Sequence, residues 1–583
     1  MIHPHFALAA VLALTLASSA DAQPGKPHPL APGNAPADVV KPAEGGATPS
    51  ASKTAPDAAP ATARGRSSDG VVAAMSKMPL PGMAPAKLFP DLCLLRYKVT
   101  THSDASQEYF DQGLGYWYSY VWMEAARSFE TALQYDPDCA MAWWGLYRAL
   151  DRQGKRDLAT RALLKANELK DRASWREQQL IWASMQATGN APGVGDAEAR
   201  KRAAVTTIDN LIAVHDEDEE AWYFRAQLAG GSSLFGGQVA SVPFYKALLR
   251  INPLHPGANH ELVHYYENAR RPALGWVYAE NYIKSSPGIP HPFHMQAHLA
   301  TRIGRWARTS DRSARAIELE RNYHKEQGVS PREDQQYSHH LEILLVSLTH
   351  DGRFKEASAI EDEARTIGAR PQLPAFRLHL AAREYDAALK IANEYRRNDK
   401  NMASYLTALV YLKKGDCSRA LPEIEVLQHA LANRKNDKQL EYRLWETQGL
   451  YLCQTGAAEQ GVKLLQKAVA RSKDDYGHHA WGNGAYYMEA WGLGALRGGK
   501  DAAAEEAYLE ALAHDPGSVR AALGLQVLCE RQGRPQEAQR YAELARKCWA
   551  KADSGCLARE LQELRAPVSK PEGPPEKPVG PAR

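Results

Sequence analysis

The sequence predicts an all-α fold, built as a solenoid of helix–turn–helix repeats. Between residues 89 and 565, Leu, Ala and aromatic residues recur at helical spacing, and the alternation typical of strands is scarce. Small and aromatic residues also return with a period of 34 residues. At 583 residues, the chain is long enough for several domains or for one extended array.

The N-terminus, residues 1–22, has the features of an export signal. Phe6 to Ala17 is an apolar run interrupted only by Thr15, and Ala20-Asp21-Ala22 before Gln23 fits small-x-small cleavage. No Lys or Arg precedes the run, and the alternative is a merely apolar N-terminus. No later segment approaches about 20 uninterrupted apolar residues. We therefore expect an exported protein, periplasmic or secreted, without a transmembrane anchor.

Two segments flank the predicted solenoid. Residues 23–88 are dominated by Pro, Ala, Gly, Ser and Lys, and residues 566–583 alternate Pro with charged residues. Segments with so few apolar side chains cannot bury enough surface to offset their chain entropy. The expected organisation is a signal peptide, a disordered linker over 23–88, a solenoid over 89–565 and a disordered tail over 566–583.

The repeat is clearest in its first unit. Small residues at Gly113 and Ala125 let two antiparallel helices approach closely, aromatic side chains fill the space between units, and Pro137 ends the second helix. That unit comprises Tyr109, Gly113, Tyr116, Ala125, Phe129, Ala132 and Pro137. Later units in the same register contain Trp143, Leu146, Ala159, Leu163 and Ala166; Trp445, Gly449, Leu452, Gly461, Leu465 and Ala468; Met488, Gly492, Ala504, Tyr508, Ala511 and Pro516; and Leu525, Ala538, Ala542 and Ala545. Weaker units lie around 354–357 and 411–420.

A period of 34 residues is that of the tetratricopeptide repeat, whose helix pairs stack into a superhelix with a concave groove. The region from Leu94 to Asp553 resembles a bacterial family of exported tetratricopeptide-repeat proteins. The resemblance rests on residues 109–114, 136–145 and 255–260, and on the histidines that follow. It implies a fold and a histidine pattern but no reaction. The chain departs from the pattern at Glu261, where an aromatic residue is usual, and at Gln296-Ala297, where Pro-Ser is usual.

Two pairs of histidines follow the repeat period. His260 and His264 are followed, 34 residues later, by His294 and His298. Offsets of four and three residues place His260, His264 and Glu267 on one stripe of a helix. We expect this stripe to face the groove, because the first helices of such repeats line the concave surface. A third first helix is expected to bring His339 and His340 to the same groove.

Three interpretations of this set remain open. In the first, the residues bind zinc or copper, which neutral imidazole suits, through His260, His264, Glu267, His294, His298 and His339. In the second, they hold a carboxylate or another polar group of a ligand by hydrogen bonds, with Arg302, Arg305 and Lys284 as nearby cations. In the third, the histidines are solvated or are satisfied by tyrosines such as Tyr265 and Tyr266. The expected groove residues beside the metal ligands are Arg302, Tyr265 and His340.

The segment 260–264 also matches the HExxH pattern of zinc proteases, with Glu261 in the position of a general base. The residues after His264 lack the further His-Gly-His of one protease class, and Glu280 is only a loose candidate for the third ligand of the other class. No strand-rich subdomain is predicted to hold an extended substrate. The sequence therefore favours a histidine-lined groove over a peptidase.

Charge, motifs and cysteines exclude other functions. With 71 Lys and Arg against 68 Asp and Glu, the charge of the chain is nearly balanced, and no basic block indicates a surface for nucleic acid. It lacks a P-loop, a GxSxG motif and a dinucleotide-binding GxGxxG motif. Seven cysteines contain no CxxC, and Cys548 and Cys556 are close enough in sequence to form a disulfide.

Taken together, the sequence favours an exported scaffold or binding protein that presents its groove to a protein or peptide partner and carries a His/Glu metal site. The alternative is a zinc- or copper-dependent enzyme on the same solenoid, with an unknown reaction and unknown catalytic residues.

Overall fold

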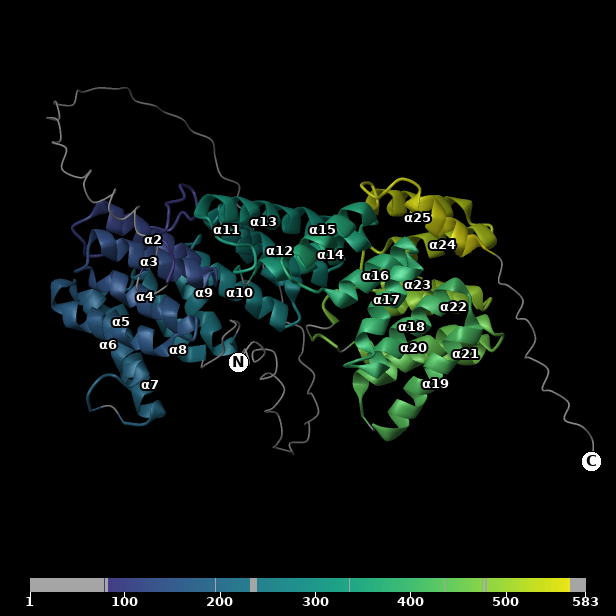
Figure 1. Cartoon of the computed structure of the whole chain (residues 1–583), viewed down its shortest axis with the longest axis horizontal. Coiled ribbons are helices and arrows are strands. Elements are labelled where there is room, and N and C mark those ends of the chain that lie inside the picture. Colours follow the sequence, from purple (N-terminus) through teal and green to yellow (C-terminus); the bar gives the residue numbers. More distant parts are fainter. Residues whose placement is uncertain are drawn as a thin grey trace, which may run out of the picture. The chain divides into compact units, whose positions relative to one another are not determined.

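The computed structural model describes Met78 and residues 82–566, except 194, 231–237, 335, 435, 474 and 478–479. These residues form 25 α-helices and three short 3₁₀ helices, and none of them lies in a strand (Figure 1). The predicted all-α solenoid is therefore confirmed. The expected signal peptide, most of the expected linker and the tail from 567 onwards lie outside the described residues. None of the described helices is long and apolar enough to cross a membrane.

The N-terminal part consists of four helix pairs. Within each pair the two helices pack closely, and the first helices α2, α4 and α6 also contact one another in turn, as expected for stacked hairpins. The helices are α2 (Asp104–Tyr118), α3 (Trp122–Tyr135), α4 (Ala140–Arg152), α5 (Arg156–Leu169), η1 (Lys170–Arg172), α6 (Trp175–Thr188), α7 (Ala197–Val214), α8 (Glu219–Gly230), η2 (Val239–Ser241) and α9 (Val242–Ile251).

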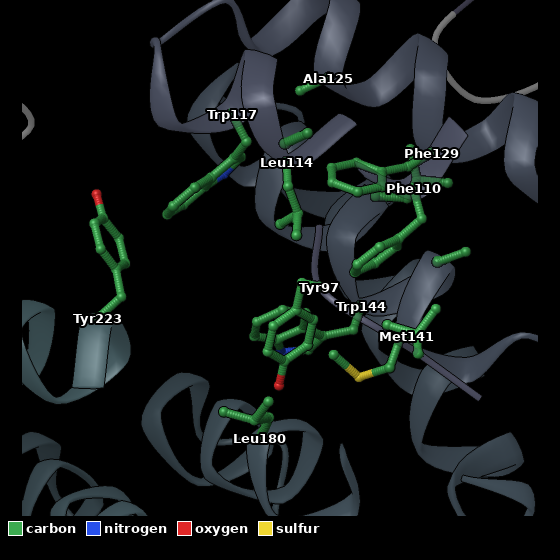
Figure 2. Close-up of a cluster of buried hydrophobic side chains, with 14 of the residues drawn as sticks. Tyr97, Phe110, Leu114, Trp117, Ala125, Phe129, Met141, Trp144, Leu180 and Tyr223 are labelled. Carbon is green, nitrogen blue, oxygen red and sulfur yellow. The ribbon is translucent and has the colours of Figure 1, made fainter. Parts of the chain in front are cut away.

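The ring of Phe129 on α3 shows how the repeat residues set this packing. It lies against Phe110, with ring centroids 5.4 Å apart (Figure 2). A Cβ atom added at Gly113 would lie 2.7 Å from this ring, and one added at Gly145 would lie 2.5 Å from it. Glycine on both neighbouring first helices therefore makes the space that the aromatic ring fills.

The central part carries the histidines. Its first helices α10, α12 and α14 stand next to one another in that order, and α10 also contacts α2. The helices are α10 (Pro256–Asn268), η3 (Pro272–Gly275), α11 (Trp276–Ser285), α12 (Pro290–Arg302), α13 (Trp306–Gln327), α14 (Tyr337–His350) and α15 (Phe354–Thr366).

The C-terminal part continues the array and then returns to the central helices. The Trp549 indole donates to the carbonyl of His350 at 2.7 Å, and the amide of Gly517 donates to the carbonyl of Gly304 at 3.1 Å. The helices are α16 (Gln372–Ala382), α17 (Tyr385–Tyr395), α18 (Lys400–Lys414), α19 (Cys417–Asn433), α20 (Lys438–Gln454), α21 (Ala458–Ser472), α22 (Tyr486–Arg497), α23 (Asp501–His514), α24 (Val519–Arg531), α25 (Pro535–Cys548) and α26 (Cys556–Arg565).

The segment 84–99 runs against both N-terminal and central helices. The amide of Ala86 donates to Thr131 Oγ1 at 2.8 Å, and Lys87 Nζ donates to the carbonyl of Glu326 at 2.7 Å. Further along, the amide of Leu94 donates to the carbonyl of Ser285 at 2.7 Å. The last residues of the expected linker thus make specific contacts.

All seven cysteines lie in the described part of the chain and are free, Cys548 and Cys556 included. Burial raises the pKa of each thiol, for Cys139 and Cys453 to about 12. Thiols with raised pKa values are weak nucleophiles and weak metal ligands at neutral pH.

Candidate metal centre

Seven histidines from three neighbouring first helices meet in one cluster, which we call the histidine cluster. Proline stands at the first position of both α10 and α12, at Pro256 and Pro290. Proline suits this position because it is preorganised for a helix start, and here it starts both helices in the same register. The members of the cluster are His260 and His264 on α10, His291, His294 and His298 on α12, and His339 and His340 on α14.

The cluster contains three overlapping groups of three histidines. In each group, one ring nitrogen per residue lies within 4.8 Å of the others, a spacing at which a metal ion can be held. We call His260, His264 and His291 the first triplet, and His294, His298 and His339 the second triplet. A middle group shares one histidine with each triplet and consists of His291, His294 and His340.

Two of the histidines are anchored through Nδ1. His260 Nδ1 donates to the carbonyl of Tyr118 at 2.6 Å, and since a carbonyl only accepts, the proton is on Nδ1 and the lone pair is on Nε2. His298 Nδ1 lies 3.1 Å from Glu267 Oε1 and donates to it. Histidines that bind metals are commonly oriented by such a carbonyl or carboxylate behind the ring.

Glu267 is held as a carboxylate by two neighbours. Burial alone would raise its pKa, but the charges and hydrogen bonds of His298 and Arg302 lower the pKa to about 2. Arg302 Nε donates to Glu267 Oε1 at 3.1 Å. The hydrogen bond from the guanidinium thus favours the carboxylate form of Glu267.

Six of the seven histidines of the cluster have pKa values lowered by burial, which favours their neutral form. Burial lowers the pKa of His264 and of His340 to about 4. Burial, followed by the neighbouring imidazoles, also lowers the pKa of His260, His291 and His294. The neutral imidazole is the form that coordinates metal ions.

Several ring nitrogens of the cluster are buried without a hydrogen-bond partner in the described structure, namely His264 Nε2, His291 Nδ1, His298 Nε2 and His340 Nε2. Each such group left unsatisfied costs about 1–3 kcal/mol. Meanwhile the side chains of His298 and His339 are 13% and 33% exposed, so the second triplet is open to solvent. The second triplet thus combines a buried unpaired nitrogen, His298 Nε2, with two partly exposed side chains.

Aromatic side chains from outside the three helices cover the cluster. Tyr120, in the turn between α2 and α3, stacks on His264 with ring centroids 5.6 Å apart. Its φ of 59° lies in the left-handed region, which non-glycine residues rarely adopt. Residues that do adopt it often lie at functional sites. On the other side, Trp481 lies 5.0 Å from His298, and Tyr476 lies 4.0 Å from the Arg302 guanidinium. The loop after α21 therefore reaches the cluster, and its His478 and His479 fall outside the described residues.

Five of the six expected metal ligands, all of them histidines, belong to the triplets, whereas the sixth, Glu267, does not. Glu267 belongs to none of the triplets and instead contacts His298 from behind. Of the expected groove residues, Arg302 pairs with Glu267, and His340 belongs to the middle group. Tyr265 packs against Tyr266, with ring centroids 5.1 Å apart.

Sequence reasoning missed His291 and Glu320. His291 precedes His294 by three residues and His298 by seven, so its position on the same helical stripe was a usable signal. Glu320 Oε1 lies 2.7 Å from His340 Nδ1, but it comes from α13 and no spacing pointed to it. Burial raises the pKa of Glu320 and lowers that of His340, which favours the neutral form of both side chains.

Glu261, the expected base of an HExxH site, faces tyrosines. Its Oε1 accepts from Tyr120 Oη at 2.8 Å and from Tyr223 Oη at 3.1 Å. Burial raises its pKa, and the two hydrogen bonds lower it in part. Because the carboxylate is satisfied in this way, the structure gives Glu261 no role beside a metal ion.

A separate cavity of about 160 Å³ lies among the first helices from α14 to α24, and α26 also lines it. Leucine side chains make up much of its wall. Its charged residues are Arg377, Arg383, Lys413, Arg497, Arg520, Glu446, Glu489, Glu560 and Glu563. The position on the inner helices is where repeat proteins of this type commonly bind partners.

Residues 110–174 and 489–553 match the tetratricopeptide repeat family. Among solved structures, the chain is similar to a chain of the APC/C hetero-tetramer Cut9-Hcn1, with 11% identity, a TM-score of 0.30 and coverage of 79% of this chain and 90% of that chain. It is also similar to human IFIT1 in a dimer with m7Gppp-AAAA, with 13% identity, a TM-score of 0.26 and coverage of 77% and 91%. No curated protein matches the sequence. With the helix pairs described above, the matched repeats make the fold an all-α solenoid of tetratricopeptide type.

Proposed function

We propose that the protein binds a transition-metal ion, zinc or copper, in the histidine cluster of its central repeats. The observation that carries this proposal is the geometry of the triplets, whose ring nitrogens lie within 4.8 Å of one another. Imidazole is a good ligand for both ions, and the triplets contain no thiolate that would favour Cu(I).

The unpaired nitrogens favour this function over a purely structural cluster. A buried cluster of neutral imidazoles is stable without a metal ion when each ring nitrogen has a hydrogen-bond partner. Four buried nitrogens find none in the described structure, and a bound cation would take up such lone pairs. Glu267 behind His298 and the Tyr118 carbonyl behind His260 then orient two of the ligands.

The proposal has a direct test. The full-length protein is stripped with a chelator and titrated with Zn²⁺ or Cu²⁺, and the bound metal is measured by elemental analysis and calorimetry. We expect His264→Ala and His298→Ala each to bind less metal or to bind it more weakly than the wild type does, because each substitution removes one imidazole ligand. His429→Ala, an exposed histidine on α19, is the control and should bind as the wild type does. Absence of bound metal in the wild type would overturn the proposal.

One further observation favours a second function, metal-dependent catalysis. Three protein ligands leave a coordination position open, which is typical of catalytic rather than structural zinc sites. Such an ion supplies an activated water or polarises a bound oxygen. Turnover of an ester, phosphoester or peptide by the metal-loaded protein, lost in His264→Ala and retained in His429→Ala, would support an enzyme. Metal binding without such turnover would favour a scaffold.

We also propose that the chain is exported and that its C-terminal concave surface binds a protein or peptide partner. The apolar N-terminal run supports export, and the charged cavity on the inner helices supports the partner. Cell fractionation tests the first proposal, and recovery in the cytosol would contradict it. Loss of a captured partner in Arg377→Ala, with retention in the exposed-site variant His429→Ala, tests the second.

A further inference from the structure

We infer that the histidine cluster holds two metal ions, one on the first triplet and one on the second. This inference rests on the proposed metal binding. The first ion would be bound by His260, His264 and His291, and the second by His294, His298 and His339.

The length of a metal–nitrogen bond prevents one ion from using both triplets. Zinc–imidazole bonds are about 2.0–2.1 Å long, so two ligand atoms on one ion are at most about 4.2 Å apart. Among the described residues, the groups whose ligand atoms lie within 4.8 Å of one another contain three histidines each, and none joins a residue of α10 to one of α14. A single ion therefore reaches one end of the cluster and leaves the other end unoccupied.

Each triplet also has its own anchor. The first is held by the hydrogen bond from His260 to the Tyr118 carbonyl, and the second by the hydrogen bond from His298 to Glu267. These anchors come from different elements, since Tyr118 ends α2 and Glu267 lies on α10. Each triplet therefore has a separate hydrogen bond that orients one of its histidines.

The two end triplets are better positions than the middle group. His264 in the first triplet, and His298 and His339 in the second, are partly exposed, whereas all three histidines of the middle group are buried. Moreover, His340 of the middle group already has a close partner in Glu320, 2.7 Å away. The end triplets are thus less enclosed than the middle group, and neither of them needs His340 as a ligand.

The two ions would be close neighbours. In the middle group, His291 and His294 have ligand atoms within 4.8 Å of each other, and adding two bonds of about 2 Å gives a separation on the order of 9 Å. Like charges at this distance repel, and the buried carboxylate of Glu267 offsets this repulsion only in part. We therefore expect the second ion to bind more weakly than the first.

Stoichiometry and spectroscopy of the full-length protein test the inference. Titration of the chelator-stripped wild type with Cu²⁺ should give two equivalents per chain in two steps. At two equivalents the electron paramagnetic resonance signal should be broadened by the neighbouring ion. His264→Ala and His298→Ala should each retain one equivalent with a sharp, isolated Cu²⁺ signal, and His429→Ala should retain two.

The outcomes separate this inference from the proposed function. No bound metal would overturn metal binding itself. One equivalent in the wild type would leave metal binding standing and overturn the two-ion inference. Loss of all metal in a folded His264→Ala or His298→Ala variant would also overturn it, because the triplets would not be independent. Circular dichroism establishes folding, and the wild-type stoichiometry decides the question even if a variant fails to fold.

Discussion

Replacement of Glu267 by Gln should weaken metal binding at the second triplet. Glu267 Oε1 lies 3.1 Å from both His298 Nδ1 and Arg302 Nε. A glutamine oxygen can still accept both hydrogen bonds but carries no charge, so the interaction that orients the His298 ring and raises its basicity becomes weaker. Loss of such a partner typically lowers metal affinity 10–100-fold, which corresponds to about 1.4–2.7 kcal/mol.

Glu261→Gln is the matched control. Both glutamates are buried on α10, but Glu261 accepts hydrogen bonds from tyrosines and contacts no triplet nitrogen. The assay is competition for Zn²⁺ with a chromophoric chelator, after circular dichroism has shown that both variants are folded. We expect weaker binding in E267Q and wild-type binding in E261Q. Equal Zn²⁺ affinities of E267Q and wild type would refute the role of Glu267. If E261Q lost as much Zn²⁺ affinity as E267Q, the effect would come from replacing a buried glutamate on α10 and not from the contact with His298.

Three further predictions concern stability. Gly113→Ala should destabilise the N-terminal repeats by about 1–3 kcal/mol, because the new Cβ would lie 2.7 Å from the Phe129 ring. Gly195→Ala is the control, because its Cβ would meet only an ordinary contact. If urea unfolding showed Gly195→Ala to be the less stable variant, this account of the packing would be wrong. Burial raises the pKa of Glu446 from 4.5 to about 7. The contribution of Glu446 to the free energy of unfolding should therefore be fully present below about pH 4.5. The fold should lose up to about 3 kcal/mol of stability as the pH rises from 4.5 through 7. Glu446→Gln should flatten that part of the stability profile, and an unchanged slope would rule out Glu446 as its source. Zn²⁺ at 100 times its dissociation constant should stabilise the wild type by about 2.7 kcal/mol, and this gain should shrink in His298→Ala; an equal rise in melting temperature in both would argue against binding at the cluster.

The fold could be predicted because its determinants are local and periodic. Gly113 and Phe129 occupy fixed positions in the repeat, and the structure places the glycine directly against the ring. The helix pairs follow from this pattern because each first helix packs on the next. By contrast, the C-terminal helices return to the turn after His350 through apolar packing and hydrogen bonds such as those of Trp549, for which the sequence has no periodic signal.

The candidate site could be predicted as far as it follows the period. His260 and His294, one repeat apart, were recognisable because α10 and α12 begin in the same register. Glu320 and Tyr120 were not, because one comes from a second helix and the other from a turn about 140 residues before His260. The contacts of Tyr120 depend on the meeting of α2 with α10, which are far apart in the sequence.

Because each triplet takes its histidines from two neighbouring first helices, metal binding would be coupled to the stacking of the repeats. The first triplet takes its histidines from α10 and α12, and the second takes them from α12 and α14, so each ion would bridge a different pair of neighbouring repeats. In solenoids, stability is approximately the sum of the repeats and of the interfaces between neighbours. An ion in a triplet would therefore strengthen one interface, and weakening that interface would loosen the ion by the same free energy. Because α12 belongs to both triplets, its correct stacking on both neighbours is the condition on which the whole centre depends.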